Sequence, residues 1–208
     1  MAESASLPAE LPPTLSGIDP SWSRLVDVPG LDGGGRTFHV LDSYADRADK
    51  AHLTVLCVHG NPSWSYLWRN VIATAPRGVR VVAPDHLNMG YSERCGSDRT
   101  LSQRVDDLGH LTDVLGIEGS VITLAHDWGG PISMGWAQRH LAQMRGAVLT
   151  NTAVAQPGSG TPPKLITTAG SAALLRTVTE RTSTFIRAGL ALSRPQPSPE
   201  VRQGFLAP

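Results

Sequence analysis

One aspartate, at the centre of a predicted tight turn, has neighbours in the sequence that indicate a chemical role more clearly than those of any other residue. Asp127 stands among small residues in the segment Ala125-His126-Asp127-Trp128-Gly129-Gly130. A short apolar run, 121–124, precedes the segment, and an amphipathic run begins at Pro131. This pattern predicts a strand, a sharp turn and a helix, because small residues let the strand and helix pack closely while one side chain is pushed outward. A carboxylate placed there can attack an electrophilic carbon and form a covalent ester, which water must then cleave.

A second loop is expected to face this carboxylate. His59-Gly60-Asn61-Pro62 follows an apolar run that ends at Val58. Backbone N–H groups of such a loop, together with the N–H of the residue after the nucleophile, can form an oxyanion hole. The Asn61 amide and the Trp128 indole can also donate hydrogen bonds, which suits a leaving anion such as a halide or a developing oxyanion. The helix that begins near Trp128 adds positive potential, which favours an ionised Asp127.

Each of these three residues has a simpler interpretation. Asp127 could be a helix N-cap, Asn61 a turn residue before Pro62, and Trp128 an aromatic residue of the core. The preceding strand, the small residues and the matching Asn61 loop favour the functional interpretation of all three. Asp85, at the end of another apolar run, is interpreted differently. We predict that it holds a loop through backbone hydrogen bonds and takes no part in catalysis.

The elements that must position these residues alternate along the chain between residues 36 and 153. Apolar, largely β-branched runs predict strands, and apolar residues at helical spacing predict helices. The expected strands are 36–43, 52–59, 79–84, 120–124 and 147–150, and the expected helices are 64–75, 101–115 and 131–144. Continuous apolar strands that alternate with amphipathic helices predict an α/β fold, with a mostly parallel sheet covered by helices on both faces.

The remainder of the chain divides into a lead-in and a tail. Residues 1–35 are rich in Pro, Ser and Gly, and predict an irregular lead-in that ends in a turn. After residue 153, a loop is followed by one or two expected helices over 164–192, with no further core strand. We therefore expect 36–153 to be an incomplete core and 154–208 to be part of a helical cap, with the C-terminal strands of the sheet missing.

Composition and charge argue against several classes of protein. Eighteen basic and 18 acidic residues give a formal net charge of zero, so nothing draws the chain to nucleic acid or an anionic membrane. No apolar run approaches the roughly 18 residues of a membrane span, and the N-terminus lacks the features of a signal peptide. Cys57 and Cys95 form neither a disulfide framework nor a metal motif, and Cys57 is expected in the core. Without a ligand cluster, phosphate loop or dinucleotide fingerprint, no metal or organic cofactor is expected, and a cytoplasmic, reduced location is the default.

Three blocks of the sequence, 55–70, 83–92 and the turn around Asp127, occur in an order that resembles the haloalkane dehalogenase branch of the α/β-hydrolases. The resemblance implies the α/β-hydrolase fold and an enzyme in which Asp127 is the nucleophile. It also implies that Asn61 and Trp128 hold the leaving halide or the oxyanion. Epoxide hydrolases share the aspartate turn but usually carry an aromatic residue in place of Asn61, which disfavours that alternative.

A closer likeness rests on four shorter segments: Pro62-Ser63-Trp64, 85–90, 149–153 and 198–202. These are similar to the β-lactone decarboxylases of long-chain olefin biosynthesis, which open a β-lactone and release carbon dioxide and an alkene. The likeness implies a hydrophobic small-molecule substrate, and fusion to or association with an acyl-activating ligase. Haloalkane dehalogenation stays the alternative, because no physical argument from these residues separates a lactone from an alkyl halide.

The general base and its acid partner have no evident place in the sequence. In this fold the order is nucleophile, acid and histidine, whereas the last of the seven histidines is His140, inside the expected helix after the nucleophile. His59 and His126 are expected to be structural, and Asn151 occupies a position where some dehalogenases place the acid. We therefore expect acid and base beyond Pro208, and a 208-residue chain that forms an ester without turnover. A non-catalytic hydrolase-like binding protein and a truncated remnant are the remaining alternatives.

Overall fold

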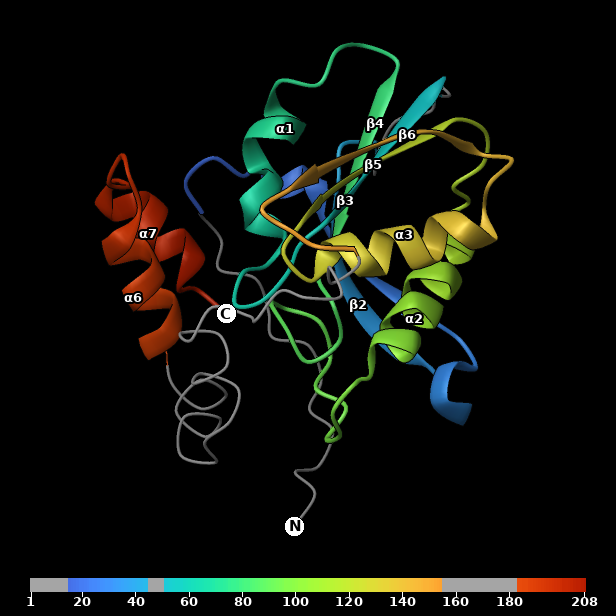
Figure 1. The fold of residues 1–208 in the computed structure, drawn as a ribbon, viewed down its shortest axis with the longest axis horizontal. Coiled ribbons are helices and arrows are strands. Elements are labelled where there is room, and N and C mark those ends of the chain that lie inside the picture. Colours follow the sequence, from blue (N-terminus) through green and yellow to red (C-terminus); the bar gives the residue numbers. More distant parts are fainter. Residues whose placement is uncertain (1–14, 45–50, 155–182) are drawn as a thin grey trace, which may run out of the picture. The chain divides into compact units, whose positions relative to one another are not determined.

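A computed structural model of the protein describes residues 15–44, 51–154 and 183–208 (Figure 1). The chain forms two compact units, one of residues 1–154 together with Pro208 and one of residues 155–207. The first unit contains a six-stranded sheet with the strand order β1-β2-β4-β3-β5-β6. Its strands are β1 (Ser23–Val28), β2 (Arg36–Asp42), β3 (Leu53–Val58), β4 (Val79–Pro84), β5 (Val121–His126) and β6 (Met144–Thr150). Its helices are α1 (Arg69–Ala73), α2 (Leu101–Val114) and α3 (Gly129–Arg139), with 3-10 turns η1 (Pro20–Trp22), η2 (Leu31–Gly33) and η3 (Ser65–Trp68).

The strand pairing confirms a mostly parallel sheet. Strands β4, β3, β5 and β6 pair in parallel, whereas β1 pairs with β2, and β2 with β4, in the antiparallel sense. The five strands and three helices expected from the sequence are all present, although η3 forms the first turns of the helix expected over 64–75. The helix expected over 131–144 ends at Arg139, because the chain reverses at residues 140–143 and Met144 begins β6.

The prediction that residues 1–35 are irregular throughout is wrong for β1. Val26 and Val28 of this strand are buried, while the alternate residues Leu25 and Asp27 face solvent. This alternation is typical of a strand with one solvated face. The prolines and glycines on either side of the strand dominate the local composition and obscure the alternation of residues that would have predicted a strand.

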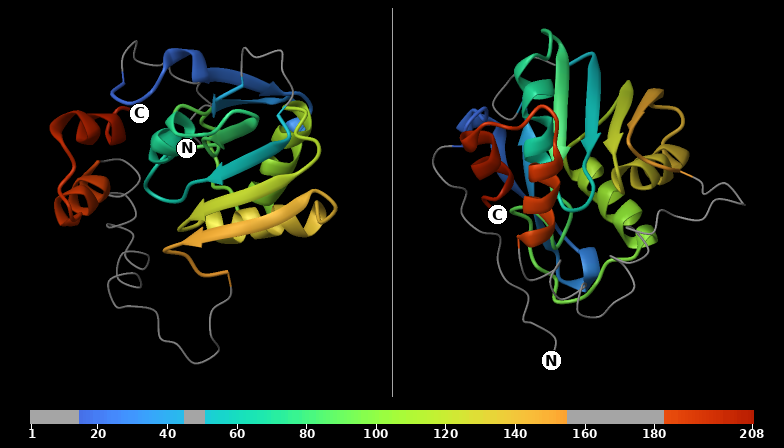
Figure 2. Two further views of the ribbon diagram at one scale, coloured as in Figure 1. Left: turned by 90° about the horizontal axis from the view of Figure 1, so that it is seen from above. Right: turned by 60° about the vertical axis from the view of Figure 1, so that its left-hand side comes forward.

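Two hydrophobic clusters lie on opposite faces of the sheet, as the alternation of side chains along each strand requires. In β3, Leu56 and Val58 contribute to the cluster that packs against α2 and α3, whereas Cys57 between them contributes to the cluster that packs against η3 and α1. Figures 1 and 2 show the same arrangement, with α1 on one side of the sheet and α2 and α3 on the other. Helices on both faces are therefore confirmed.

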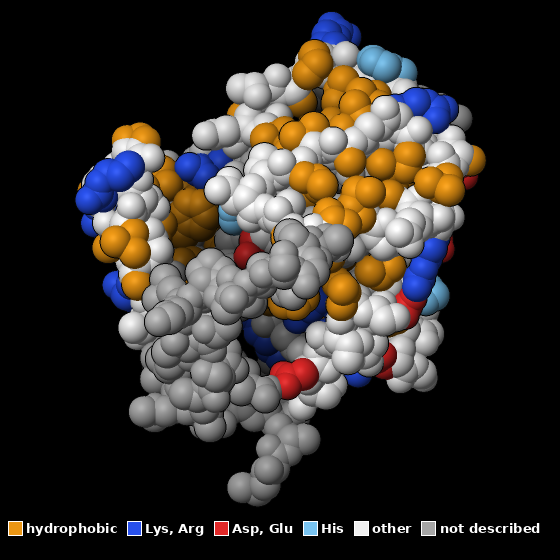
Figure 3. All heavy atoms as spheres, in the orientation of Figure 1, with side chains coloured by type: hydrophobic (Ala, Val, Ile, Leu, Met, Phe, Trp, Pro, Cys, Tyr) orange, Lys and Arg blue, Asp and Glu red, His pale blue; other side chains and the backbone are white. Residues whose placement is uncertain are grey.

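Strand β6 forms one edge of the sheet in the described part of the first unit. Val148 and Leu149 in this strand are exposed, and the space-filling view shows hydrophobic side chains at the surface over this part of the core (Figure 3). No further strand follows within residues 151–154 or 183–208. None of the described helices is long and apolar enough to span a membrane.

The second unit contributes two described helices, α6 (Thr184–Leu192) and α7 (Pro199–Phe205). Helix α6 falls within the range where helices were expected, while the rest of that range, up to residue 182, lies outside the described residues. Helix α7 was not predicted. Its signal is the pair Ser198-Pro199, because the Ser198 hydroxyl accepts a hydrogen bond from the N–H of Val201 and proline suits the first helical position. The assignment of residues 154–208 to a cap stays a prediction.

Gly129, the first residue of α3, is expected not to tolerate a side chain. A Cβ atom at this position would clash with the carbonyl oxygen of Val58, which belongs to the backbone of β3. We expect Gly129→Ala to lower the free energy of unfolding by about 1–3 kcal/mol, measured by urea denaturation. Gly109 in α2 has no atom within 4 Å of its Cβ position, so Gly109→Ala should raise the same quantity by roughly 0.5–1 kcal/mol. Equal effects of the two changes would contradict the close approach of α3 to β3.

Candidate active site

The candidate active site lies where β3 and β5 end side by side. Val58 of β3 pairs with Ala125 of β5, so the loops that follow the two strands leave the same edge of the sheet next to each other. One loop carries Asn61, and the other carries Asp127 and Trp128. Ligands of α/β sheets bind outside the carboxyl ends of the parallel strands, which is where these three residues lie.

The turn after β5 has the sharp form expected from the sequence. Asp127 has a φ of 54°, a left-handed conformation that is uncommon for a residue other than glycine. A Cβ atom at Gly60 would clash with the Asp127 carboxylate and lie 2.6 Å from the backbone nitrogen of Trp128. Small residues at positions 60 and 129 therefore let the two loops and α3 approach the aspartate closely.

The Asp127 carboxylate faces the loop after β3. The backbone N–H of Asn61 donates to Oδ1 of Asp127 at 2.9 Å. The N-cap residue of α3 is Trp128, without a side-chain capping bond, so Asp127 is not the N-cap of this helix. The interpretation of the aspartate as a simple cap is therefore wrong.

The Asn61 and Trp128 side chains belong to the two loops that meet at Asp127. Among the described hydrogen bonds, neither the Asn61 amide nor the Trp128 indole donates to Asp127, and Trp128 is 54% exposed. An indole so exposed is not a residue of the core in the described structure. Their role as holders of a halide or an oxyanion stays a prediction.

Asp85 is a buried anchor, as predicted. Its Oδ1 accepts from the N–H of Ser65 at 2.6 Å, and its Oδ2 accepts from the N–H of Tyr91 at 2.9 Å and from Nδ1 of His39 at 2.7 Å. Burial opposes its ionisation, but His39, its hydrogen bonds and the nearby His59 outweigh burial and lower the pKa of Asp85 to about 2. This carboxylate therefore joins β2, the loop after β4 and the segment that follows Asn61.

His59 and His86 form a second buried polar pair beside Asp85. Nδ1 of His59 donates to the carbonyl of Gly60 at 3.0 Å, and its Nε2 accepts from the N–H of His86 at 3.1 Å. Nε2 of His86 donates to the carbonyl of His59 at 2.9 Å. Both ring nitrogens of His59 are therefore occupied, which confirms that it is structural. Burial lowers the pKa of His59 and lowers that of His86 well below its ordinary range.

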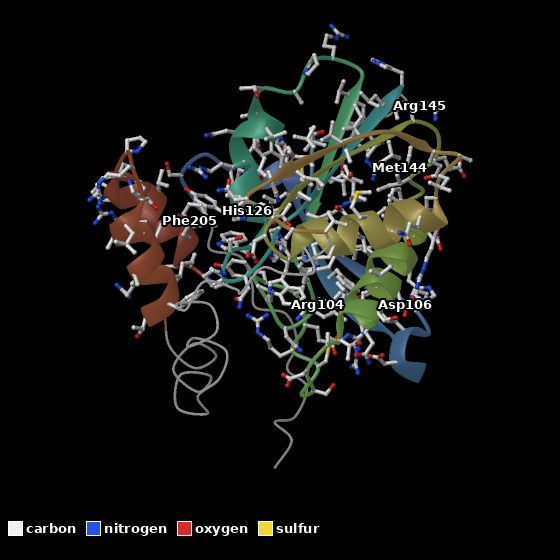
Figure 4. All side chains as sticks on the ribbon, in the orientation of Figure 1. Arg104, Asp106, His126, Met144, Arg145 and Phe205 are labelled. Carbon is white, nitrogen blue, oxygen red and sulfur yellow. The ribbon has the colours of Figure 1, made fainter. Side chains whose placement is uncertain are left out.

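All seven histidines lie within the described residues, and none hydrogen-bonds to Asp127. His126 lies at the carboxyl end of β5, beside the turn (Figure 4), and its buried Nδ1 has no partner among the described atoms. His140 donates from Nδ1 to the carbonyl of Trp136 and stacks on that ring. The described residues therefore supply a carboxylate and an N–H donor, but no histidine that is hydrogen-bonded to the carboxylate.

The buried histidines predict a loss of stability at acidic pH. His59 and His86 have folded-state pKa values below 6.5, so the unfolded chain binds protons first as the pH falls. We expect the free energy of unfolding to decrease below about pH 6.5, with each group contributing at most about 1.4 kcal/mol per pH unit. The stabilisation from Asp85, whose folded pKa of about 2 lies below its unfolded value of 3.8, is lost only between those two values.

Urea denaturation between pH 4 and 8 measures this dependence, and two variants locate its origin. His86→Gln should reduce the slope below pH 6.5, because one buried titrating ring is removed. His110→Gln, which removes an exposed ring, should leave the slope unchanged. A flat profile for the unchanged protein would contradict the assignment of neutral, buried rings.

No metal site is evident among the described residues, where no three His, Cys, Asp or Glu side chains are grouped to hold an ion. Cys57 and Cys95 are both free thiols. Cys57 is buried, as predicted, and burial raises the pKa of its thiol. Cys95 is half-buried, so it is the more accessible of the two nucleophilic sulfurs.

The fold and the turn at Asp127 define the class of protein. A family model described as alpha/beta hydrolase fold matches residues 54–177, and the chain belongs to this family. The solved structure of the haloalkane dehalogenase DatA from Agrobacterium tumefaciens superposes with a TM-score of 0.73 over 92% of this chain and 65% of that chain. Its sequence identity is 18%, so this likeness supports the fold alone.

Within the family, about half of the chain is similar to an oxetan-2-one decarboxylase and to a haloalkane dehalogenase. It is 43% identical over 119 residues to the cis-3-alkyl-4-alkyloxetan-2-one decarboxylase of Xanthomonas campestris, a match that covers 53% of this chain and 40% of the relative. It is also 40% identical over 99 residues to haloalkane dehalogenase 2 of Mycobacterium tuberculosis, covering 47% of this chain and 34% of the relative. The chain thus matches less than half the length of either curated relative, and both relatives are enzymes.

Proposed function

We propose that Asp127 is the nucleophile of an enzyme that forms a covalent ester with its substrate. The observation that supports this most strongly is the hydrogen bond from the Asn61 N–H to Oδ1 of Asp127, at a strained turn. Oδ1, which this hydrogen bond holds, becomes the carbonyl oxygen of the ester. Oδ2 is then the oxygen that attacks the substrate. If water later adds to that ester, the charge develops on Oδ1, where an N–H donor already lies.

We propose a β-lactone with alkyl groups on ring carbons 3 and 4 as the substrate. Attack of Oδ2 on carbon 4 would join that carbon to Asp127, break its bond to the ring oxygen and leave carbon 2 as a free carboxylate. Loss of that carboxylate as carbon dioxide would form the double bond between carbons 3 and 4, break the new ester bond and return Asp127 as a carboxylate. The higher identity to the oxetan-2-one decarboxylase favours the lactone over an alkyl halide. A place in olefin biosynthesis, beside an acyl-activating ligase, is part of the same proposal. Hydrolysis of a carbon–halogen bond is the second candidate, supported by the likeness to the dehalogenases.

Stoichiometric labelling of the 208-residue chain tests the nucleophile. With 1-bromohexane we expect one hexyl group per chain, mapped by mass spectrometry to Asp127, and one bromide released. The ester should persist, because none of the described histidines is hydrogen-bonded to Asp127 in a way that could activate water. The labelling is done in a Cys95→Ser background, which removes the accessible thiol as a competing site of alkylation. Absence of an adduct, or an adduct only at other residues, would instead favour a non-catalytic binding protein.

A direct comparison of two probes separates the substrate classes. The labelling rate with a cis-3,4-dialkyl oxetan-2-one is compared with that of a 1-bromoalkane of matched chain length, and the alkene is measured by gas chromatography. Faster reaction with the lactone, accompanied by alkene, supports the decarboxylase. Faster reaction with the bromoalkane, without alkene from the lactone, would favour the dehalogenase.

A further inference from the structure

The segment that follows β6 reaches the turn at Asp127. Thr150 pairs with His126 across β5 and β6, and its hydroxyl donates to the carbonyl of Ala125 at 3.0 Å. Two residues further on, the hydroxyl of Thr152 donates to the carbonyl oxygen of Asp127 at 2.5 Å. Strand register therefore places one threonine beside the end of β5 and the next beside the turn itself.

The turn has room for the Thr152 side chain because of a glycine. A Cβ atom at Gly130 would clash with Oγ1 of Thr152 and lie within 2.9 Å of two of its carbon atoms. The N–H of Gly130 also donates to the Asp127 carbonyl oxygen, at 3.0 Å. This oxygen is therefore held by two donors, one from the start of α3 and one from the segment after β6.

Holding the Asp127 carbonyl oxygen also orients the other end of the same peptide group, which is the N–H of Trp128. The peptide between Asp127 and Trp128 is planar, and in a trans peptide the C=O and N–H point in opposite directions. Holding the Asp127 oxygen therefore fixes the direction of the Trp128 N–H, whose nitrogen lies beside Gly60. It also supports the φ of 54° at Asp127, a sparsely populated conformation that persists only when the surroundings hold it.

We infer that Thr152 is a positioning residue, whose hydroxyl aims the Asp127 carboxylate and the Trp128 N–H at the substrate. The inference rests on the proposed function, in which Asp127 is the nucleophile. The described hydrogen bond of the Thr152 hydroxyl goes to the Asp127 carbonyl oxygen and not to the carboxylate, so Thr152 acts through the peptide group that it anchors. The sequence singled out 149–153 only by likeness, and the hydroxyl contact supplies a physical role for one residue of that segment.

Single-turnover labelling by 1-bromohexane, followed by mass spectrometry across a range of probe concentrations, tests this role. Thr152→Val keeps the shape of the side chain and removes the donor. We expect its maximal labelling rate to fall about 10- to 100-fold, while the half-saturating concentration of probe stays within about twofold of the unchanged protein. Thr152→Ser, which keeps the hydroxyl, should label within about threefold of the unchanged protein.

Thr150→Val is the matched control, because it removes the same kind of hydroxyl-to-carbonyl bond before the turn. It should label within about threefold of the unchanged protein. The inference is overturned if Thr152→Val labels at the normal rate, if Thr150→Val slows labelling as much, or if Thr152→Ser fails to restore it. A Thr152→Val chain that does not fold by circular dichroism would also overturn it, since the hydroxyl would then serve the fold.

Asp127→Asn distinguishes failure of this inference from failure of the proposed function. If Asp127→Asn still forms the adduct at the normal rate, the proposed nucleophile is wrong. If Asp127→Asn is inactive and Thr152→Val reacts normally, the nucleophile stands and only the positioning role fails.

Discussion

Asp127→Asn is expected to abolish covalent labelling by 1-bromohexane, with a loss of at least about 10⁴-fold in rate. An amide cannot displace a halide, yet its carbonyl oxygen can still accept the N–H of Asn61, so the turn keeps its shape. The measurement is the fraction of chain that carries the hexyl group over time, read by intact mass spectrometry. Thermal melting alongside should show little change, which separates lost chemistry from lost structure.

Asp106 offers a matched control for this change. It is a carboxylate of α2 that pairs with Arg139 of α3 at the surface and is labelled in Figure 4. Asp106→Asn removes the same charge from the same unit without altering the turn, so it should label at the unchanged rate. Undiminished labelling of Asp127→Asn would mean that another group is alkylated, and the proposed function would then fail.

Asp85→Asn is expected to cause the largest loss of stability, about 3–5 kcal/mol in the free energy of unfolding. Three N–H donors converge on this buried carboxylate, from Ser65, Tyr91 and His39. An amide has one accepting oxygen, so its NH₂ group would face at least one of these donors and leave a buried polar group unpaired. Urea denaturation at pH 7 measures the loss.

Asp32→Asn provides the comparison for Asp85. Asp32 is partly exposed and pairs with Arg36 and with the buried Arg99, which keeps Asp107 as a second partner when Asp32 is replaced. Asp32→Asn should therefore lower the free energy of unfolding by no more than about 1 kcal/mol. A similar cost for the two changes would contradict the interpretation of Asp85 as the anchor of two loops. Because one of those loops continues from Asn61, the folded fraction of Asp85→Asn should also label more slowly.

Local patterns in the sequence predicted the elements that carry the site. The apolar run before Ala125 and the small residues after Asp127 predicted β5, the turn and α3, because each pattern depends on neighbours in the chain. The alternation of strands and helices likewise predicted the parallel sheet. The sequence also indicated that Asp85 binds backbone groups, because an aspartate that ends a strand before a turn often does so.

Other features depend on the neighbours of these elements in space. Strand β1 belongs to the sheet because it pairs with β2. The chain reverses at residues 140–143 because Met144 begins β6, which pairs with β5. The partners of Asp85 come from three separate segments, which no local pattern connects.

Residues that are neighbours in the chain were enough to predict the candidate nucleophile and the fold that presents it, because periodicity and closely spaced small residues encode the strand, the turn and the helix. The tertiary structure alone decided what holds that residue. Asn61 reaches the Asp127 carboxylate because β3 pairs with β5, and Thr152 reaches the Asp127 carbonyl because β5 pairs with β6. Strand register sets these contacts, and register depends on how distant segments pack rather than on the residues that border the turn.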